Sequence, residues 1–275
     1  MKTKKAAELI EELQKEGYFV TVQSHATDKV YQADISKEGT PLIFGVVSDT
    51  HIGSRYSQMT HLHSFYRVCQ QRGIKLVLHA GDLIDGHGIY RGMEFEQFLH
   101  GAQAQGDYTV KHYPKVEGLE TWVISGNHCL SFYKESGTNV LADIAERRKD
   151  IKYLGDYGAF VKMNGLTAYL HHGRSGNAYA RSYRLQKLIE QLAPEQKPNL
   201  FLLGHYHCPC ILPGYRNVEA VQLPCFQAQT PFLKTSGLFP FVAGLIITIV
   251  PEKKRGIGRI TYEWVPYYRM KEDDY

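Results

Sequence analysis

The sequence has no hydrophobic run long enough to cross a membrane. Its longest apolar stretch, residues 239–250, spans 12 positions and is interrupted by Pro240 and Gly244. A membrane-spanning helix needs about 20 apolar residues, so we expect no membrane partner. The first 14 residues are charged and amphipathic, without an apolar core or a small-residue cleavage site, so we expect no secretion signal.

Cysteine is scarce. The chain has 5 cysteines in 275 residues, an odd number of scattered thiols that excludes a disulfide scaffold. This usage is typical of a reducing compartment, and we expect a cytoplasmic protein. Cys208 and Cys210 stand one residue apart, but two cysteines fall short of the four ligands of a structural zinc site.

Neither sign of charge dominates. The net charge is +4, with 43% hydrophobic and 22% charged residues, which excludes a disordered or fibrous chain. A mild positive charge permits an anionic ligand without predicting nucleic-acid binding by itself. Histidine, in contrast, is plentiful, with 13 copies, and it is both the commonest metal ligand and the usual proton-transfer group near neutral pH.

The first 40 residues have the pattern of a small appendage. Apolar residues at helical spacing predict a helix over 3–16, and two short β-type runs at 18–23 and 30–35 predict a hairpin. A helix followed by a hairpin is also the back half of a winged-helix module, and that alternative stays open. The breaker cluster at 37–41 places the start of the main domain, 41–275, after it.

From residue 41 the pattern alternates between buried strands and helices, which indicates an α/β fold. The expected strands are 41–49, 74–82, 119–127, 157–163, 166–172 and 199–205, and the expected helices are 57–72, 93–112, 137–149 and 180–192. Beyond residue 205 the sequence predicts only strands, at 218–224, 242–250 and 259–267. This strand-rich tail suggests a second sheet packed on the first.

Five of these strands end in residues that bind metals. The clusters are Asp49-Thr50-His51, Asp82 with Asp85, Asn127-His128, His171-His172 and His205-Tyr206-His207. Ligand sites of open α/β sheets lie at the carboxyl ends of the strands, so we expect these clusters to converge. In an extended segment residues i and i+2 face the same way, which would aim each i, i+2 pair at one point. Glycines at 81, 126, 173 and 204 would let the backbone approach the site closely.

The ligand types predict two divalent ions. Carboxylates, imidazoles and one amide form a mixed oxygen and nitrogen set that suits Mn²⁺, Fe or Zn²⁺ better than calcium. The set is larger than one ion needs. Two ions bridged by a carboxylate would use all of it and would suit the hydrolysis of a phosphate ester.

The clusters form the motif series DxH (49–51), GDxxD (81–85), GNH (126–128), a histidine before glycine (172–173) and GHxH (204–207). This series resembles the calcineurin-like metallophosphoesterases. The resemblance implies a four-layer αββα sandwich of two mixed β-sheets flanked by helices. It also implies two metal ions, Mn²⁺ above all, with Fe, Zn²⁺ or Ni²⁺ as alternatives. Asp49, His51, Asp82 and His207 would hold one ion, and Asp82, Asn127, His172 and His205 would hold the other, with Asp82 as the bridge.

The resemblance gives two further residues a catalytic role. His128 would lie beside the phosphate and assist the leaving group after water activated by the metals attacks phosphorus. Asp85 would orient His128 through its carboxylate. Two departures from the family's usual pattern bear on this: Cys129 stands where an acidic residue often follows GNH, and Gly86 replaces the arginine that the phosphoprotein phosphatases carry there. The fourth motif offers two neighbouring histidines, and we choose His172 over His171 because it precedes the glycine.

The substrate is predicted less sharply. Residues 48–54, SDTHIGS, resemble the first motif of break-repair nucleases and of the small, nuclease-like subunit of archaeal replicative DNA polymerase. Segments 86–116 and 174–187 mix basic and aromatic residues that could grip phosphates and stack bases, although ordinary surface and core positions explain them equally well. We therefore expect a phosphodiester substrate, either DNA, RNA or a nucleotide. The alternatives are a phosphomonoesterase or protein phosphatase, a cyclic-nucleotide phosphodiesterase, or a non-catalytic nucleic-acid-binding subunit, and the sequence does not predict the oligomeric state.

Overall fold

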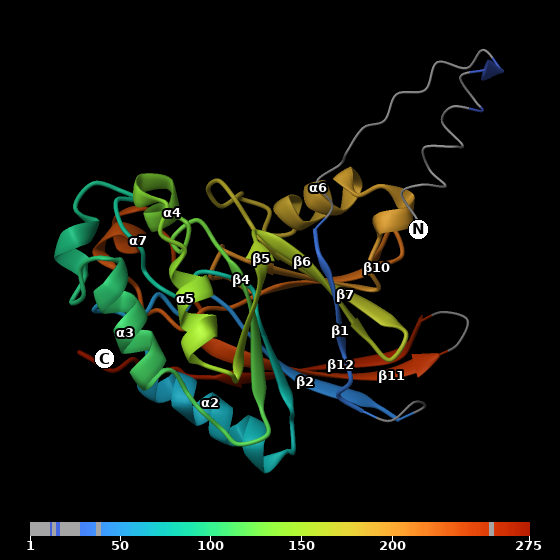
Figure 1. Ribbon diagram of the computed structural model, residues 1–275, viewed down its shortest axis with the longest axis horizontal. Coiled ribbons are helices and arrows are strands. Elements are labelled where there is room, and N and C mark those ends of the chain that lie inside the picture. The colour runs from blue at the N-terminus through green and yellow to red at the C-terminus, as the bar shows by residue number, and fades with distance from the viewer. Residues whose placement is uncertain (1–11, 13–14, 17–27, 37–39, 253–255) are drawn as a thin grey trace.

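Two six-stranded β-sheets face each other at the centre of the molecule (Figure 1). The computed structural model describes residues 12, 15–16, 28–36, 40–252 and 256–275. Sheet A has the strand order β1 (Val30–Ala33), β6 (Gly158–Met163), β7 (Leu166–His172), β8 (Leu200–Gly204), β10 (Val218–Gln222) and β9 (Cys210–Tyr215). Sheet B has the order β12 (Gly256–Pro266), β11 (Ala243–Glu252), β2 (Leu42–Val47), β3 (Leu76–His79), β4 (Glu120–Ser125) and β5 (Ile151–Asp156).

Helices cover the outer face of each sheet. The helices α2 (Met59–Gln71), α3 (Ala102–His112) and α5 (Val140–Arg147) lie over sheet B, and α6 (Tyr183–Gln191) lies over sheet A. Two short helices, α4 (Ser131–Ser136) and α7 (Pro231–Thr235), and two 3-10 turns, η1 (Met93–Glu96) and η2 (Pro194–Gln196), lie in the connections. Helix, sheet, sheet, helix is the four-layer αββα sandwich that the sequence predicted, and each sheet mixes parallel with antiparallel pairs.

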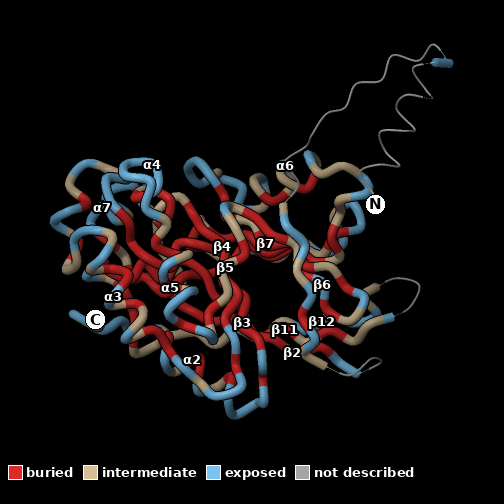
Figure 2. The backbone as a smooth tube through the Cα atoms, in the orientation of Figure 1, coloured by how far each residue is buried: buried red, intermediate tan, exposed pale blue. Residues whose placement is uncertain are grey.

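The buried residues form one cluster between each pair of layers, and Figure 2 shows them concentrated along the sheets. The central cluster joins the facing sides of the two sheets, for example Phe44 and Leu78 of sheet B with Leu170 and Leu202 of sheet A. Because both faces of a central strand are buried, these strands are nearly continuous apolar runs. The apolar run at 239–250 is explained in this way, since most of it forms β11 between β12 and β2.

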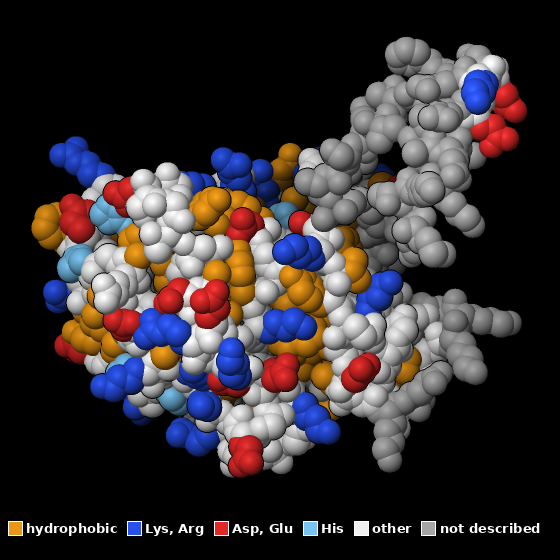
Figure 3. All heavy atoms as spheres, viewed as in Figure 1, with side chains coloured by type: hydrophobic (Ala, Val, Ile, Leu, Met, Phe, Trp, Pro, Cys, Tyr) orange, Lys and Arg blue, Asp and Glu red, His pale blue; other side chains and the backbone are white. Residues whose placement is uncertain are grey.

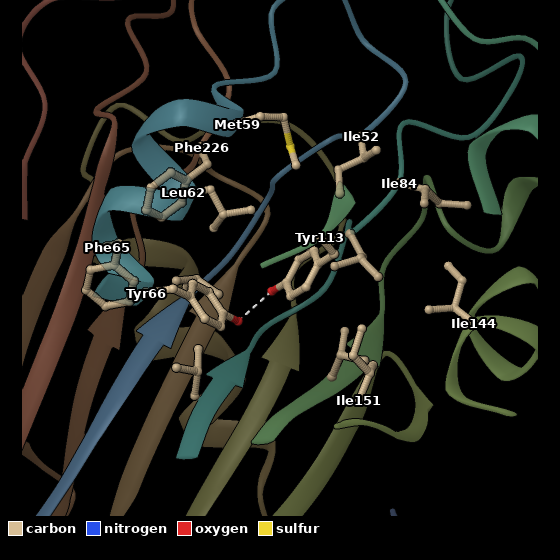
Figure 4. Packing of buried hydrophobic residues seen from close by; sticks show 14 of the residues in the cluster. Ile52, Met59, Leu62, Phe65, Tyr66, Ile84, Tyr113, Ile144, Ile151 and Phe226 are labelled. Carbon is tan, nitrogen blue, oxygen red and sulfur yellow. Dashed lines mark hydrogen bonds between the residues drawn. The ribbon is translucent and has the colours of Figure 1, made fainter. Parts of the chain in front are cut away.

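The cluster under α2 contains a buried polar contact. The hydroxyl of Tyr66 on α2 lies 2.7 Å from the Tyr113 hydroxyl (Figure 4). It also lies 2.6 Å from Thr121 Oγ1. Three buried hydroxyl groups thereby satisfy one another, which removes most of the cost of burying them. Tyr113 is thus a core residue, although it belongs to the basic and aromatic segment 86–116.

The sheet topology sets the position of the site. Strands β2, β3, β4 and β5 run parallel, so the loops after β2, β3 and β4 leave the same edge of sheet B. Strands β7 and β8 of sheet A are also parallel neighbours, and their ends carry His172 and His205. All the motif loops therefore meet at one end of the sandwich.

Several elements differ from the sequence prediction. The tail is not all strand, because Thr230 caps the short helix α7, its side chain accepting a hydrogen bond from Leu233 N, with Pro231 in the first turn. The helix expected over 93–112 is broken, with η1 and α3 separated at Gly101, whose φ is +89°. The elements α4, β5 and β9 were not predicted. Strands β5 and β9 include Lys152, Gly155, Pro213 and Gly214, so neither has the continuous apolar run by which the other strands were located.

The structure describes only part of the N-terminal segment for which a helix and a hairpin were predicted. The expected helix 3–16 and the strand 18–23 lie essentially outside the described residues, as does the winged-helix alternative. The strand expected at 30–35 is present as β1, and it pairs in parallel with β6, Val30 opposite Phe160. These residues therefore form the edge of sheet A, and the domain boundary near residue 40 stays a prediction.

None of the helices formed by the described residues is long and apolar enough to span a bilayer. On the face shown in Figure 3, basic and acidic side chains are interspersed. This face carries no broad surface of one sign, so any argument for an anionic ligand has to come from the site itself.

Candidate metal and active site

The predicted site residues fall in three groups, of which the first and third share His51: Asp49, His51 and His207; Asp82, His172 and His205; and His51, Asp85 and His128. Within each group the potential ligand atoms all lie within 4.8 Å of one another. Asn127, the one predicted ligand outside these groups, lines the same cleft as Asp82 and His128. Each of the first two groups contains three of the four residues of one ligand set that the family resemblance implied, and Asp82 lies only in the second group. Their role as ligands stays a prediction.

The backbone brings these side chains together through left-handed turns. Five of the residues have positive φ angles, namely Asp49 (52°), His51 (45°), Asp82 (52°), His205 (85°) and His207 (56°). Asp49 and His51 fall in one group, but not through the extended alternation that we expected from the sequence, and His205 and His207 fall in two different groups. Left-handed non-glycine residues cost about 1–3 kcal/mol each and concentrate at functional sites. Such strain at these positions therefore supports a functional role.

Glycine is required where the strands approach the site most closely. A Cβ atom on Gly126 would overlap the Asp82 carboxylate and the His172 ring, and one on Gly81 would overlap the same ring. The expectation that these glycines allow close approach is thus confirmed. Any larger residue would displace the Asp82 and His172 side chains.

The donor atoms face one another in a way that suits cations. His51 Nε2 and His207 Nε2 lie 3.2 Å apart, and the Asp49 Oδ1 atom is 3.9 Å from the first and 3.4 Å from the second. The Asn127 Oδ1 atom is buried without a hydrogen-bond partner among the described residues. Lone pairs of imidazole, carboxylate and amide that converge on one space fit Mn²⁺, Fe or Zn²⁺.

Groups around the site hold these ligands in position. His172 Nδ1 donates to the carbonyl of Ala80 at 2.8 Å, which leaves its Nε2 atom facing Asp82 Oδ2 at 2.9 Å. The Asp49 carboxylate accepts hydrogen bonds from Ser48 Oγ at 2.5 Å and from the His205 amide at 2.9 Å. Support of this kind fixes ring orientation and tautomer in metal sites.

Burial and neighbouring charges together set the protonation states of the site residues. Burial alone would raise the pKa of the Asp82 carboxyl, but His172, His128 and His51 together outweigh burial and hold that pKa well below its usual range. For His172 the penalty of burial is likewise overcome by Asp82, which raises the pKa of the imidazole to about 9. Burial lowers the pKa of His51 and of His205 to about 4. The carboxylates are therefore ionised, and these two imidazoles are neutral near pH 7, which is the state in which they can bind a metal.

The two neighbouring histidines of β7 face opposite sides of sheet A. The ring of His172 lies in the group with Asp82 and His205. The ring of His171 lies against Tyr169 and Phe201, at centroid distances of 5.7 and 6.0 Å. The geometry agrees with our choice of His172, whose role as a ligand stays a prediction.

Asp85 differs from the expectation. Its main-chain carbonyl, and not its carboxylate, contacts His128 Nδ1, at 2.5 Å. The carboxylate Oδ1 atom is 3.8 Å from His128 Nδ1 but only 3.2 Å from His51 Nδ1. The carboxylate therefore lies nearer to His51 than to His128, without a hydrogen bond to the His51 ring, and the hydrogen bond of His128 is with the Asp85 backbone.

Two supporting residues escaped the sequence analysis. The buried Gln97 donates from Nε2 to Asp85 Oδ2 at 2.7 Å and to the Gly86 carbonyl at 2.9 Å. The buried His79 lies at the end of β3, with Nε2 3.2 Å from Thr50 Oγ1. A histidine directly before the AGD sequence was a detectable signal, whereas Gln97 comes from a connecting loop and has no fixed spacing to any motif.

A cleft of about 590 Å³ opens over these groups. It is lined by site residues and by Arg174, Ser175 and Asn177 of the loop before α6. Further lining residues include Tyr90, Gln227, Thr230, Phe232, Leu233 and Leu238. Of the two basic and aromatic segments, Tyr90 and Arg174 reach the cleft, while Tyr108 stacks on His112 within α3 at 4.2 Å. Only part of each segment is thus available to a ligand.

Comparison with known proteins supports the same family. The model of the calcineurin-like phosphoesterase superfamily domain matches residues 42–220. The DNA polymerase II small subunit of Methanothermobacter thermautotrophicus is 24% identical over 86% of this chain and 59% of its own length. For the subunit of that name from Archaeoglobus fulgidus the identity is 25%, over 73% of this chain and 50% of its own. The chain thus spans little more than half the length of these relatives.

Among solved structures, the 5′-nucleotidase precursor of Thermus thermophilus is 12% identical, with a TM-score of 0.44, over 82% of this chain and 54% of that chain. The matched segment, 42–220, covers more than half of the present chain and contains every motif of the site. The chain belongs to the calcineurin-like phosphoesterase superfamily.

Proposed function

We propose that this protein is a phosphodiesterase that depends on two divalent metal ions and cleaves nucleic acid or nucleotides. The observation that carries the proposal is the placement of two carboxylate and imidazole groups beside His128 in one cleft. A water-accessible cleft with two cation sites and an adjacent proton donor is an arrangement suited to hydrolysis of phosphate esters.

Asp49, His51, Asp82 and His207 would hold one ion, and Asp82, Asn127, His172 and His205 would hold the other. We propose Mn²⁺ as the preferred metal, with Fe, Zn²⁺ or Ni²⁺ as alternatives. When bound, such ions lower the pKa of water and neutralise charge on the phosphoryl oxygens. We assign the bridge to Asp82 because the family resemblance implies it, and two observations support this: Asp82 groups with His172 and His205, and its charge also acts on the pKa of His51.

His128 would act on the leaving oxygen. Its Nδ1 atom is held by the carbonyl of Asp85, so the other ring nitrogen is left for the substrate. His128 also lines the cleft. Burial lowers the pKa of the His128 imidazole, so only the protonated fraction of the ring can donate to the departing alkoxide. A general acid of this kind typically contributes about 10²–10⁴-fold to the rate.

The charge of the cleft favours diesters. Arg174 is the one arginine or lysine among the described residues that line it, and Gly86 stands where the phosphoprotein phosphatases have an arginine. A phosphodiester has one negative charge per phosphate, whereas a monoester approaches two near neutral pH. Two metal ions and one arginine therefore suffice for a diester.

The relatives support DNA as the substrate and favour a second candidate function. They are named DNA polymerase II small subunits, so this chain could instead serve as a non-catalytic subunit that assembles with a polymerase. Against this, all the predicted ligands and His128 are present and converge. The scarcity of cysteine supports a cytoplasmic location for either candidate.

A metal-reconstituted assay tests the proposal. Protein loaded with Mn²⁺ is compared on bis-p-nitrophenyl phosphate, p-nitrophenyl phosphate, 2′,3′-cyclic nucleotides and labelled single- and double-stranded DNA and RNA. We expect diester hydrolysis to exceed monoester hydrolysis, and Asp82→Asn to abolish it together with most bound metal. If monoesters were turned over a hundredfold faster while DNA and RNA stayed intact, the proposal would be wrong. No hydrolysis with any metal would favour the non-catalytic subunit.

A further inference from the structure

One wall of the cleft is built from a stacked pair of aromatic rings. Tyr90 and Phe232 both line the cleft, with ring centroids 4.2 Å apart and ring planes inclined by 15°. They come from distant parts of the chain, the loop before η1 and the helix α7. Phe232 retains 42% of its surface exposed, which leaves part of its ring available to a ligand while another part packs on Tyr90.

The pair is held in place by Glu96. The Tyr90 hydroxyl donates to Glu96 Oε2 at 2.7 Å, and the Phe232 amide donates to Glu96 Oε1 at 3.3 Å. One carboxylate thus holds the Tyr90 ring through its hydroxyl and the Phe232 backbone through its amide before any ligand arrives. Little conformational entropy is lost on binding when the contact surface is rigid in advance.

The cleft around the pair is lined by apolar residues and by polar or charged ones. Ile89, Leu233 and Leu238 also line the cleft, and so do the imidazoles of His51, His205 and His207 and the guanidinium of Arg174. A ligand that bridges these regions needs a flat aromatic part and an anionic part a short distance away. A nucleotide has both. The volume of about 590 Å³ lies within the range of small-ligand pockets.

We propose that Phe232, backed by Tyr90, is a stacking platform for one unpaired nucleobase next to the phosphodiester that is cleaved. This inference rests on the proposed function and specifies its substrate as single-stranded nucleic acid or a single-stranded end. A base can stack on Phe232 only after it has left the stack of a duplex. Stacking is tolerant of sequence because every base has a π-face, so the platform selects nucleotides without selecting among bases.

Three esters with the same leaving group test the platform. Thymidine 5′-(p-nitrophenyl phosphate), thymidine 3′-(p-nitrophenyl phosphate) and methyl p-nitrophenyl phosphate are assayed with the Mn²⁺-loaded wild type and its variants. Phe232→Ala should lower kcat/KM for the better thymidine ester, relative to the methyl ester, by roughly 10- to 100-fold, because base stacking on an aromatic ring contributes about 1–3 kcal/mol. Phe232→Trp should retain the preference for the thymidine ester.

Phe95→Ala is the matched control. Phe95 is 81% exposed, and it is not among the described residues that line the cleft. This substitution should leave kcat/KM unchanged for the better thymidine ester and for the methyl ester. A second measurement uses a trinucleotide carrying 2-aminopurine and protein treated with EDTA, so that no cleavage occurs. The wild type and Phe95→Ala should quench the fluorescence, and Phe232→Ala should quench it at least tenfold less strongly at equal concentration.

The outcomes separate the two proposals. A wild type that hydrolyses no ester but quenches 2-aminopurine in a manner dependent on Phe232 would overturn the proposed function and support the platform. A wild type that hydrolyses the thymidine esters, with neither the ester preference nor the quenching altered in Phe232→Ala, would overturn the platform and support the proposed function.

Discussion

The imidazole of His128 is held by the main chain of Asp85 and not by its side chain. His128 Nδ1 is 2.5 Å from the Asp85 carbonyl oxygen and 3.8 Å from carboxylate Oδ1. The carboxylate accepts a hydrogen bond from Gln97 Nε2 at 2.7 Å, and its Oδ1 atom lies 3.2 Å from His51 Nδ1 without a hydrogen bond. Substitution of the Asp85 side chain therefore changes the surroundings of His51 and leaves the hydrogen bond between the backbone and His128 in place.

Asp85→Asn should therefore weaken metal binding more than it alters proton donation. We expect the Mn²⁺ affinity of the group that contains Asp49, His51 and His207 to fall by about 10- to 100-fold, as is usual when a partner of a metal-binding histidine is lost. Calorimetric titration with Mn²⁺ measures this directly. At saturating Mn²⁺ the dependence of the rate on the leaving group should match that of the wild type. A changed dependence would show that the carboxylate acts on His128 after all.

His128→Asn should retain both metals and the fold but lose activity. For a diester with a poor leaving group we expect kcat to fall by about 10²–10⁴-fold, the usual contribution of a general acid. The loss should be smaller for bis-p-nitrophenyl phosphate, because p-nitrophenolate leaves without needing a proton. Equal losses on both substrates would mean that His128 positions the phosphate, and loss of metal would make it a ligand.

The two histidines of β7 should behave differently. His172→Ala removes a ring that faces Asp82 and His205, so we expect loss of most activity and of one bound metal. His171→Ala removes a ring that packs against Tyr169 and Phe201 on the other face, so both should be retained. Elemental analysis of the purified variants gives the metal content. The reverse pattern would contradict the assignment of His172.

Gly126→Ala should disrupt the site by steric overlap alone. The added Cβ would overlap the Asp82 carboxylate and the His172 ring, so the Asp82 side chain must move. We expect bound Mn²⁺ and activity to fall by at least tenfold while circular dichroism is unchanged. Gly106→Ala is the control, because its Cβ within α3 meets Val140 Cγ1 at 3.4 Å and alanine favours a helix. Normal Mn²⁺ binding by Gly126→Ala would contradict the prediction that the added Cβ displaces the Asp82 side chain.

Arg148 should contribute far more to stability than its neighbour Arg147. The Arg148 guanidinium donates to the carbonyls of Val110, Tyr113 and Pro114 and to the Asp150 carboxylate. Arg148→Ala leaves these acceptors without their donor, and we expect the free energy of unfolding to fall by about 3 kcal/mol.

Arg147 provides the matched control for that measurement. It is exposed and pairs with Asp107 and Asp143 at the surface, so Arg147→Ala should lower the free energy of unfolding by less than about 1 kcal/mol. Urea unfolding of both variants compares the two. Equal losses would show that the buried hydrogen bonds of Arg148 are not what stabilises the loop before β4.

The sequence by itself determined the fold class and the composition of the site. Buried strands of an α/β sandwich are continuous apolar runs, so most strands could be located within two or three residues. The motif residues directly follow these runs, and the carboxyl ends of parallel strands lie at the same edge of a sheet. Convergence of Asp49, Asp82 and Asn127 was therefore predictable from local pattern and strand direction.

Only the tertiary structure decided how these residues face one another. The left-handed φ angles of Asp49, His51 and Asp82 are strained conformations that no local preference predicts, since surrounding packing imposes them. Gln97 contacts Asp85, and Phe232 stacks on Tyr90, although 12 and 142 positions separate these pairs in the sequence. Contacts between irregular loops carry no periodic signal, because their geometry is set by the rest of the folded chain.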